Sequence, residues 1–254
     1  MNKKITLVIT LLFVAAIFVA CTKNVESTVN TTDAKLTMAT HGYSALHSRT
    51  ATSSKGYYET VMSAVGGFNI AYTDFATGKQ IYLCNSVQCE HSDESCPSYF
   101  AQSYSPEQLI INSNENKLIC FARQSIDGED AGITVFSMNE DGSDRVELTK
   151  LLPGTALNGH ILISNKSVIY TMAYVPAKKE NELKQMLISI NTISGETNDI
   201  KQFNSNERIE SVKDSYIYLS KWADGNKYKV CKFNISDNTI SEILEYETQT
   251  KADT

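Results

Sequence analysis

The sequence is poor in the features that mark several large protein classes. Its 254 residues include one Trp, four Pro and 12 Gly, which excludes collagen-like and Pro/Gly-rich low-complexity chains. After residue 20 no apolar run approaches the ~20 residues that a membrane-spanning helix needs. Helical periodicity is nearly absent, so a coiled coil is excluded. Basic residues are outnumbered by 29 to 23, and the net charge of −6 provides no global attraction for nucleic acid.

Motifs of the common enzyme classes are also missing. There is no GxSxG elbow, HExxH helix, P-loop or Rossmann glycine fingerprint. Of the four His residues, His41 and His47 fall in a Ser/Thr-rich segment, His160 opens an expected strand, and His91 belongs to a Cys-rich loop. The carboxylates follow no pattern that assembles a catalytic set, so the sequence favours a non-catalytic protein over an enzyme.

The N-terminus has the pattern of an export signal. Lys3 and Lys4 precede residues 5–20, a 16-residue stretch without a charge, which suits the apolar region of a signal peptide. The stretch ends Phe18-Val19-Ala20-Cys21, which resembles the lipobox of bacterial lipoproteins. The resemblance implies that residues 1–20 are removed and that Cys21 is lipidated, anchoring the protein to the outer face of the cell membrane. A plain secretory signal is the alternative.

Residues 21–55 are predicted to be a flexible tether. Thirteen of the 34 residues from Thr22 to Lys55 are Ser or Thr, and their sparse apolar residues cannot offset the entropy of ordering the chain. A short strand at residues 36–38 is only weakly indicated. The polar C-terminal residues 248–254 are expected to form a tail.

Between these segments, residues 56–247 are predicted to form a domain of repeated β-units. Short apolar runs at residues 118–121, 168–171 and 216–219 each follow a polar turn and start 50 and 48 residues apart. A second hairpin follows each run, at residues 134–138, 186–190 and 230–233. A four-stranded antiparallel unit that recurs about every 50 residues is typical of a β-propeller blade. The predicted class is therefore all-β, a propeller-like array.

The array is expected to hold about four blades. Residues 56–246 span 191 positions, and propellers have about four to eight blades. Residues 56–83 look like an earlier unit without a convincing first strand, and nothing remains at the C-terminus to supply one. An incomplete propeller is the preferred interpretation, with a four-blade ring or an open arc as the alternatives.

A Cys-rich loop is the most distinctive segment. Residues 84–96 have the pattern Cys-x4-Cys-x-His-x4-Cys, formed by Cys84, Cys89, His91 and Cys96. Three thiolates and an imidazole are the ligand set of a structural zinc site, although the spacing differs from the common C-x2-C pairs. One disulfide with a third free thiol, or reduced thiols without a metal, are the two alternatives. Cys120 and Cys231 stand among apolar neighbours and are expected to be core residues.

This loop also carries a resemblance to a known group of proteins. The residues 76–79 (Ala-Thr-Gly-Lys), 83–84 (Leu-Cys), the Cys loop and the aromatic pair at 99–100 are similar to an element of predicted lipoproteins from Gram-positive anaerobes. Those proteins carry propeller domains of the TolB or tricorn-like kind, are mostly of unknown function and are often longer. Their usual Pro in the first spacer is missing here. The resemblance implies a propeller on a lipid anchor and names no reaction.

Two further segments have weak functional signals. The acidic residues 139–144 could supply oxygen ligands for Ca²⁺, but Asp141-Gly142 is a strong hairpin-turn signal and the turn is favoured. Trp222 and several Tyr residues could stack on sugars, although strand packing accounts for most Tyr residues in a β-protein.

The sequence therefore predicts a membrane-anchored, non-catalytic binding module for a protein, peptide or glycan. A hydrolase- or lyase-type propeller enzyme, or its subunit, and a truncated fragment without a role of its own are the alternatives.

Overall fold

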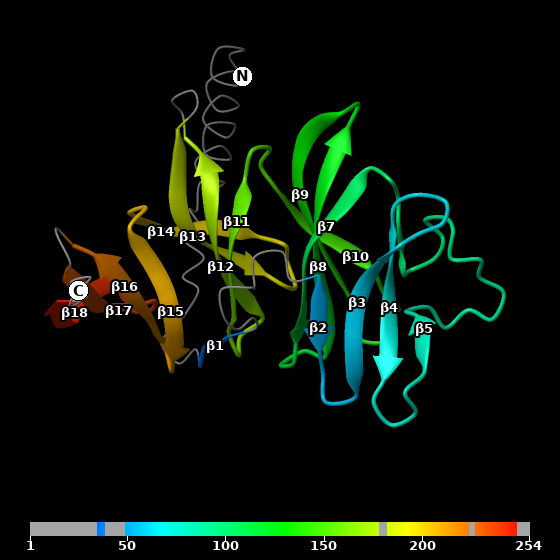
Figure 1. The fold of residues 1–254 in the computed structure, drawn as a ribbon, viewed down its shortest axis with the longest axis horizontal. Coiled ribbons are helices and arrows are strands. Elements are labelled where there is room, and N and C mark those ends of the chain that lie inside the picture. The colour runs from blue at the N-terminus through cyan, green and yellow to red at the C-terminus, as the bar shows by residue number, and fades with distance from the viewer. Residues whose placement is uncertain (1–34, 39–48, 178–181, 224–226, 248–254) are drawn as a thin grey trace, which may run out of the picture. The chain divides into compact units, whose positions relative to one another are not determined.

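The computed structural model describes residues 35–38, 49–177, 182–223 and 227–247. All of the regular elements in these ranges are β-strands, and they form four antiparallel sheets (Figure 1). The first sheet contains β2 (Thr50–Thr52), β3 (Gly56–Met62), β4 (Phe68–Asp74), β5 (Gln80–Tyr82) and β6 (Tyr99–Phe100). The second contains β7 (Tyr104–Asn112), β8 (Lys117–Ile126), β9 (Glu129–Asn139) and β10 (Val146–Leu151). No helix in the described ranges is long and apolar enough to cross a bilayer.

The third and fourth sheets repeat the pattern. The third contains β11 (Ala156–Ile163), β12 (Val168–Pro176), β13 (Leu183–Asn191) and β14 (Thr197–Phe203), with β1 (Thr37–Met38) added beside β11. The fourth contains β15 (Glu207–Lys213), β16 (Tyr216–Trp222), β17 (Lys227–Asn234) and β18 (Thr239–Glu247). Apart from β1 and β6, the strands of every sheet lie side by side in chain order, so each sheet is a meander of the kind that forms a propeller blade. The predicted all-β class and the count of four blade-like sheets are confirmed.

Three apolar clusters join the sheets in chain order. One packs the first sheet on the second, another packs the second on the third, and the last packs the third on the fourth. Strand β8 of the second sheet shows why the sequences of these strands are continuous apolar runs. Its residues 118–122 are all 0% exposed, because Leu118 and Cys120 face the first sheet while Ile119 and Phe121 face the third.

A left-handed residue recurs in the first hairpin of three sheets. Asn116, Ser167 and Asp214 have φ angles of 53°, 53° and 55°, and each lies just before the second strand of its sheet. A tight hairpin with a right-handed strand twist requires positive φ in its turn, and Asn and Asp accept it at low cost. The same turn at corresponding places supports the repeated-unit interpretation.

The folded part extends into the range predicted as a tether. β2 pairs with β3 and supplies the first strand that this unit was expected to lack, with Ala51 9% exposed. The weakly indicated strand at residues 36–38 is present as β1, and Leu36, 4% exposed, packs between the third and fourth sheets. The signal segment, Cys21 and the tail 248–254 lie outside the described residues.

Candidate metal centre

The Cys-rich loop interrupts the outer strand of the first sheet. β5 pairs with residues 71–73 of β4, and β6 pairs with Phe68 and Asn69 of the same strand. Both ends of the intervening loop converge on Ile70, whose carbonyl accepts a hydrogen bond from the Leu83 N–H and whose N–H donates to the Ser98 carbonyl. The loop is therefore an insertion into one strand, and pairing with β4 brings its two ends back together.

The four predicted ligands form one cluster. The ligand atoms of Cys84, Cys89, His91 and Cys96 all lie within 4.8 Å of one another, and His91 Nδ1 is 3.2 Å from Cys96 Sγ. Two sulfurs on one tetrahedral Zn²⁺ lie about 3.8 Å apart, so side-chain movements of about 1 Å would bring all four to bonding distance. All three loop cysteines are free thiols. The cluster can thus hold a metal ion such as zinc, and it is the one such group among the described residues.

Residues around the cluster hold its ligands in place. His91 has a φ of 54°, a left-handed turn that His tolerates better than most residues. The Asn69 amide, 1% exposed, donates to the His91 carbonyl at 3.2 Å and accepts from Ser98 Oγ at 3.0 Å. Ser98 Oγ in turn lies 3.2 Å from Cys96 Sγ, and the Tyr82 ring lies 4.9 Å from the imidazole. Such outer contacts orient metal ligands and tune their basicity.

The thiols of the loop differ in acidity. Burial acts to raise the pKa of Cys96, but hydrogen bonds from Ser98 and His91 outweigh it and lower the pKa to about 7. The pKa of Cys89 is raised to about 11. A backbone hydrogen bond at His91 acts to lower this pKa, but burial and the neighbouring Cys96 and Cys84 thiols raise it by more. Deprotonated sulfur is the metal ligand, so the lowered pKa of Cys96 favours this residue as a ligand.

Arg145 ties the loop to the second sheet. Its guanidinium, from the turn between β9 and β10, donates to the Pro97 carbonyl at 3.1 Å, to the Tyr99 carbonyl, and to the Glu94 carbonyl at 3.4 Å. It also lies 4.7 Å from the centre of the Phe100 ring, and burial lowers its pKa. Sequence reasoning missed Arg145 and Asn69 because neither belongs to a motif; both act through contacts that only the fold creates.

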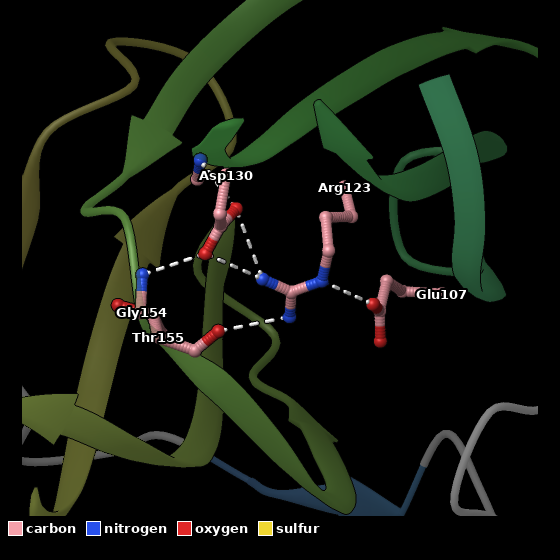
Figure 2. A network of polar contacts seen from close by, with 6 residues as sticks. Glu107, Arg123, Asp130, Gly154 and Thr155 are labelled. Carbon is pink, nitrogen blue, oxygen red and sulfur yellow. Dashed lines mark hydrogen bonds and ion pairs between the residues drawn. The ribbon is translucent and has the colours of Figure 1, made fainter. Parts of the chain in front are cut away.

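A second polar network joins the second sheet to the connection that leads to the third. Figure 2 shows the Arg123 guanidinium between Glu107 and Asp130. Its Nε lies 2.7 Å from a Glu107 carboxylate oxygen, and its Nη1 lies 3.1 Å from one of Asp130. It also donates to the Thr155 carbonyl at 2.9 Å, and Asp130 accepts from the Gly154 N–H at 2.7 Å. Burial acts to lower the pKa of Arg123, but the two carboxylates raise it overall. An arginine that neutralises both acids points to a structural role.

The other residues that the sequence analysis singled out have structural roles or lie outside the described residues. Cys120 and Cys231 are 0% and 8% exposed within apolar clusters, which confirms their role as core residues. Residues 139–144 form the expected turn, closed by a hydrogen bond from the Gly142 N–H to the Asn139 carbonyl. His41 and His47 lie outside the described residues, as does the side chain of His160.

Comparisons with known proteins agree on the fold. No family model matches the sequence, and no curated protein matches it either. A solved oligogalacturonate lyase in complex with manganese is similar over 76% of this chain and 50% of its own, with a TM-score of 0.50 and 9% identity. TolB from Acinetobacter baumannii also matches, over 77% of this chain and 42% of its own, with a TM-score of 0.44 and 11% identity. A prolyl endopeptidase matches over 78% of this chain and 28% of its own, with a TM-score of 0.48 and 13% identity. The chain spans half or less of each, and the similarity to the lyase supports the fold alone.

Proposed function

We propose that the chain is a non-catalytic binding module of the β-propeller type, with a structural Zn²⁺ in the loop of its first sheet. The observation that carries the proposal is the Cys84–Cys89–His91–Cys96 cluster. Four protein ligands complete a tetrahedral shell and leave no open position for water or substrate, as in structural rather than catalytic zinc sites. The Arg123 network is a further charged group among the described residues, and both of its acids are bonded to arginine.

The ion would act as a clip across a split strand. Cys84 follows β5 and Cys96 precedes β6, so one bound ion joins the two ends of the insertion. Apolar packing holds little of the loop between them, as Val87 illustrates with a side chain that is 99% exposed. Structural zinc sites contribute folding free energy directly, which suits a loop without a core of its own.

The lipid anchor belongs to the same proposal. It is supported by the basic residues, the 16-residue uncharged stretch and the lipobox-like ending at Cys21. Two acyl chains on Cys21 would hold the module at the outer face of the cell membrane. Mass spectrometry of the N-terminal peptide tests this: we expect a diacylglyceryl thioether on Cys21, and an unmodified peptide that retains residues 1–20 would contradict it.

Elemental analysis of the full chain, purified in detergent without exposure to oxygen, tests the metal. We expect about one zinc per chain, retained by the matched control Cys231→Ser and lost in Cys89→Ser. Chelation of the wild-type protein should lower its melting temperature, whereas chelation of Cys89→Ser should not. A metal-free wild-type protein, or a disulfide between two loop cysteines in this preparation, would refute the zinc proposal.

A further inference from the structure

The outer face of the fourth sheet carries a row of three aromatic side chains. Trp222, Tyr228 and Tyr246 are direct neighbours across β16, β17 and β18. The Trp222 and Tyr228 ring centres are 4.4 Å apart, and those of Tyr228 and Tyr246 are 5.6 Å apart. Trp222 and Tyr246 remain 48% and 44% exposed, so the row is presented to solvent.

This face differs from the corresponding faces of the preceding sheets. On β8 of the second sheet, Ile119 and Phe121 occupy this side and are buried against the third sheet. On β16 the outward residues are Tyr218, Ser220 and Trp222, which alternate with the buried residues of that strand. The outward side of this sheet therefore combines aromatic rings and Val230 with polar side chains such as Ser220.

Beside the aromatic row lies a depression of about 610 Å³. Its walls combine the three rings of the row with the polar side chains of Asn206, Arg208 and Glu210. Some of these groups are already positioned: Glu210 accepts from Ser220 Oγ at 2.5 Å, and Asn206 donates to the Trp222 carbonyl at 2.6 Å. The volume falls within the range typical of small-ligand sites, which pair an apolar lining with a few placed polar groups.

We propose that this depression binds a neutral glycan. The aromatic rings would cover the apolar faces of sugar rings, while Arg208, Glu210 and Ser220 exchange hydrogen bonds with sugar hydroxyls. Arg208 and Glu210 bring opposite charges to the same walls, which favours neither an acidic nor a basic ligand. The inference rests on the proposed binding function and adds to it the location of the site and the class of ligand.

The only tryptophan of the chain lies in this site, so intrinsic fluorescence reports on it directly. The full chain in detergent is titrated with two neutral probes, cellohexaose and chitohexaose, and with polygalacturonate as an acidic probe. We expect saturable quenching with at least one neutral probe. Tyr246→Ala should weaken binding about tenfold or more, as loss of an aromatic contact that the ligand buries does. Tyr246→Phe should keep it, and the control Phe75→Ala, an exposed ring in a hairpin of the first sheet, should not change it.

Three results would overturn the inference: no saturable binding of either neutral probe, binding that survives Tyr246→Ala, or binding of polygalacturonate alone. A peptide that binds at this face and is lost in Tyr246→Ala would also overturn it, although the binding-module proposal would stand. Cleavage of a bound hexasaccharide, detected by chromatography, would instead refute the non-catalytic function and leave the glycan site in place.

Discussion

Replacement of Arg123 by Met should destabilise the fold strongly, because one guanidinium joins three groups. It contacts Glu107 and Asp130 and donates to the Thr155 carbonyl in the connection to the third sheet. The Glu107 side chain is only 12% exposed, whereas those of Arg123 and Asp130 are 29% and 36% exposed. Removing one partner of a buried pair costs about 3–5 kcal/mol, and solvent screening at the exposed end reduces the expected loss to about 2–3 kcal/mol.

Urea unfolding followed by far-UV circular dichroism measures this loss, because the signal reports on all four sheets. Trp222 fluorescence reports on the fourth sheet alone and shows whether that sheet unfolds with the rest. The matched control is Lys79→Met, which removes a cation from an exposed hairpin and should change the free energy of unfolding by less than about 0.5 kcal/mol.

A double variant separates the charge effect from lost packing. Glu107→Gln combined with Arg123→Met removes the buried acid together with its partner, so it should be at least about 1 kcal/mol more stable than Arg123→Met alone. Arg123→Lys should restore little, because an ammonium cannot reach both acids and the carbonyl as the guanidinium fork does. The reasoning fails if Arg123→Met matches the control, or if the double variant loses the sum of the two single losses.

Three further outcomes follow from the fold. Gly142→Ala should lower the free energy of unfolding by about 3 kcal/mol, because the φ of Gly142 is +85° and a Cβ would stand 2.2 Å from the Leu83 carbonyl oxygen. Gly128→Ala is the comparison in the same urea assay: its φ is +84° but a Cβ would meet no atom, so the loss should be about 1 kcal/mol. Phe121→Ala should cost about 3–5 kcal/mol by leaving a cavity between the second and third sheets, measured as a lower melting temperature. Burial acts to raise the pKa of Asp130, but the hydrogen bonds that its carboxylate accepts from backbone N–H groups and from Arg123 lower this pKa below 3.8 overall. The stability that ionised Asp130 adds at neutral pH should therefore be lost as the pH falls below 3.8. Asp130→Asn should flatten this part of the curve of unfolding free energy against pH.

The strands were predictable because sheets buried on both faces give continuous apolar runs. The side of the sheet to which each residue points was not predictable. The runs starting at Leu118 and Val168 were aligned in the sequence, yet Leu118 faces the preceding sheet and Val168 faces the following one. The residue that corresponds to Leu118 is Ile169, which faces the second sheet. A one-residue slip reverses the face of every side chain in a strand, and a run that is apolar throughout does not reveal it.

The candidate metal site was also predictable only in part. The four candidate ligands were predictable because they lie within 13 residues and have metal-binding chemistry. Arg145 was not, because its contacts with the loop depend on how the second sheet packs on the first. β2 was also missed: it has three residues, of which only Ala51 is buried, and its strand character comes from pairing with β3.

The Cys-rich loop covers one side of the first sheet, which gives it a role beyond its own stability. On the first sheet, Asn69 points away from the second sheet, yet it is 1% exposed because its amide is bonded to His91 and Ser98 of the loop. On the fourth sheet, Trp222 and Tyr246 remain open to solvent. A bound ion that fixes the loop would therefore also keep this side of the first sheet covered, whereas the aromatic row of the fourth sheet is exposed among the described residues.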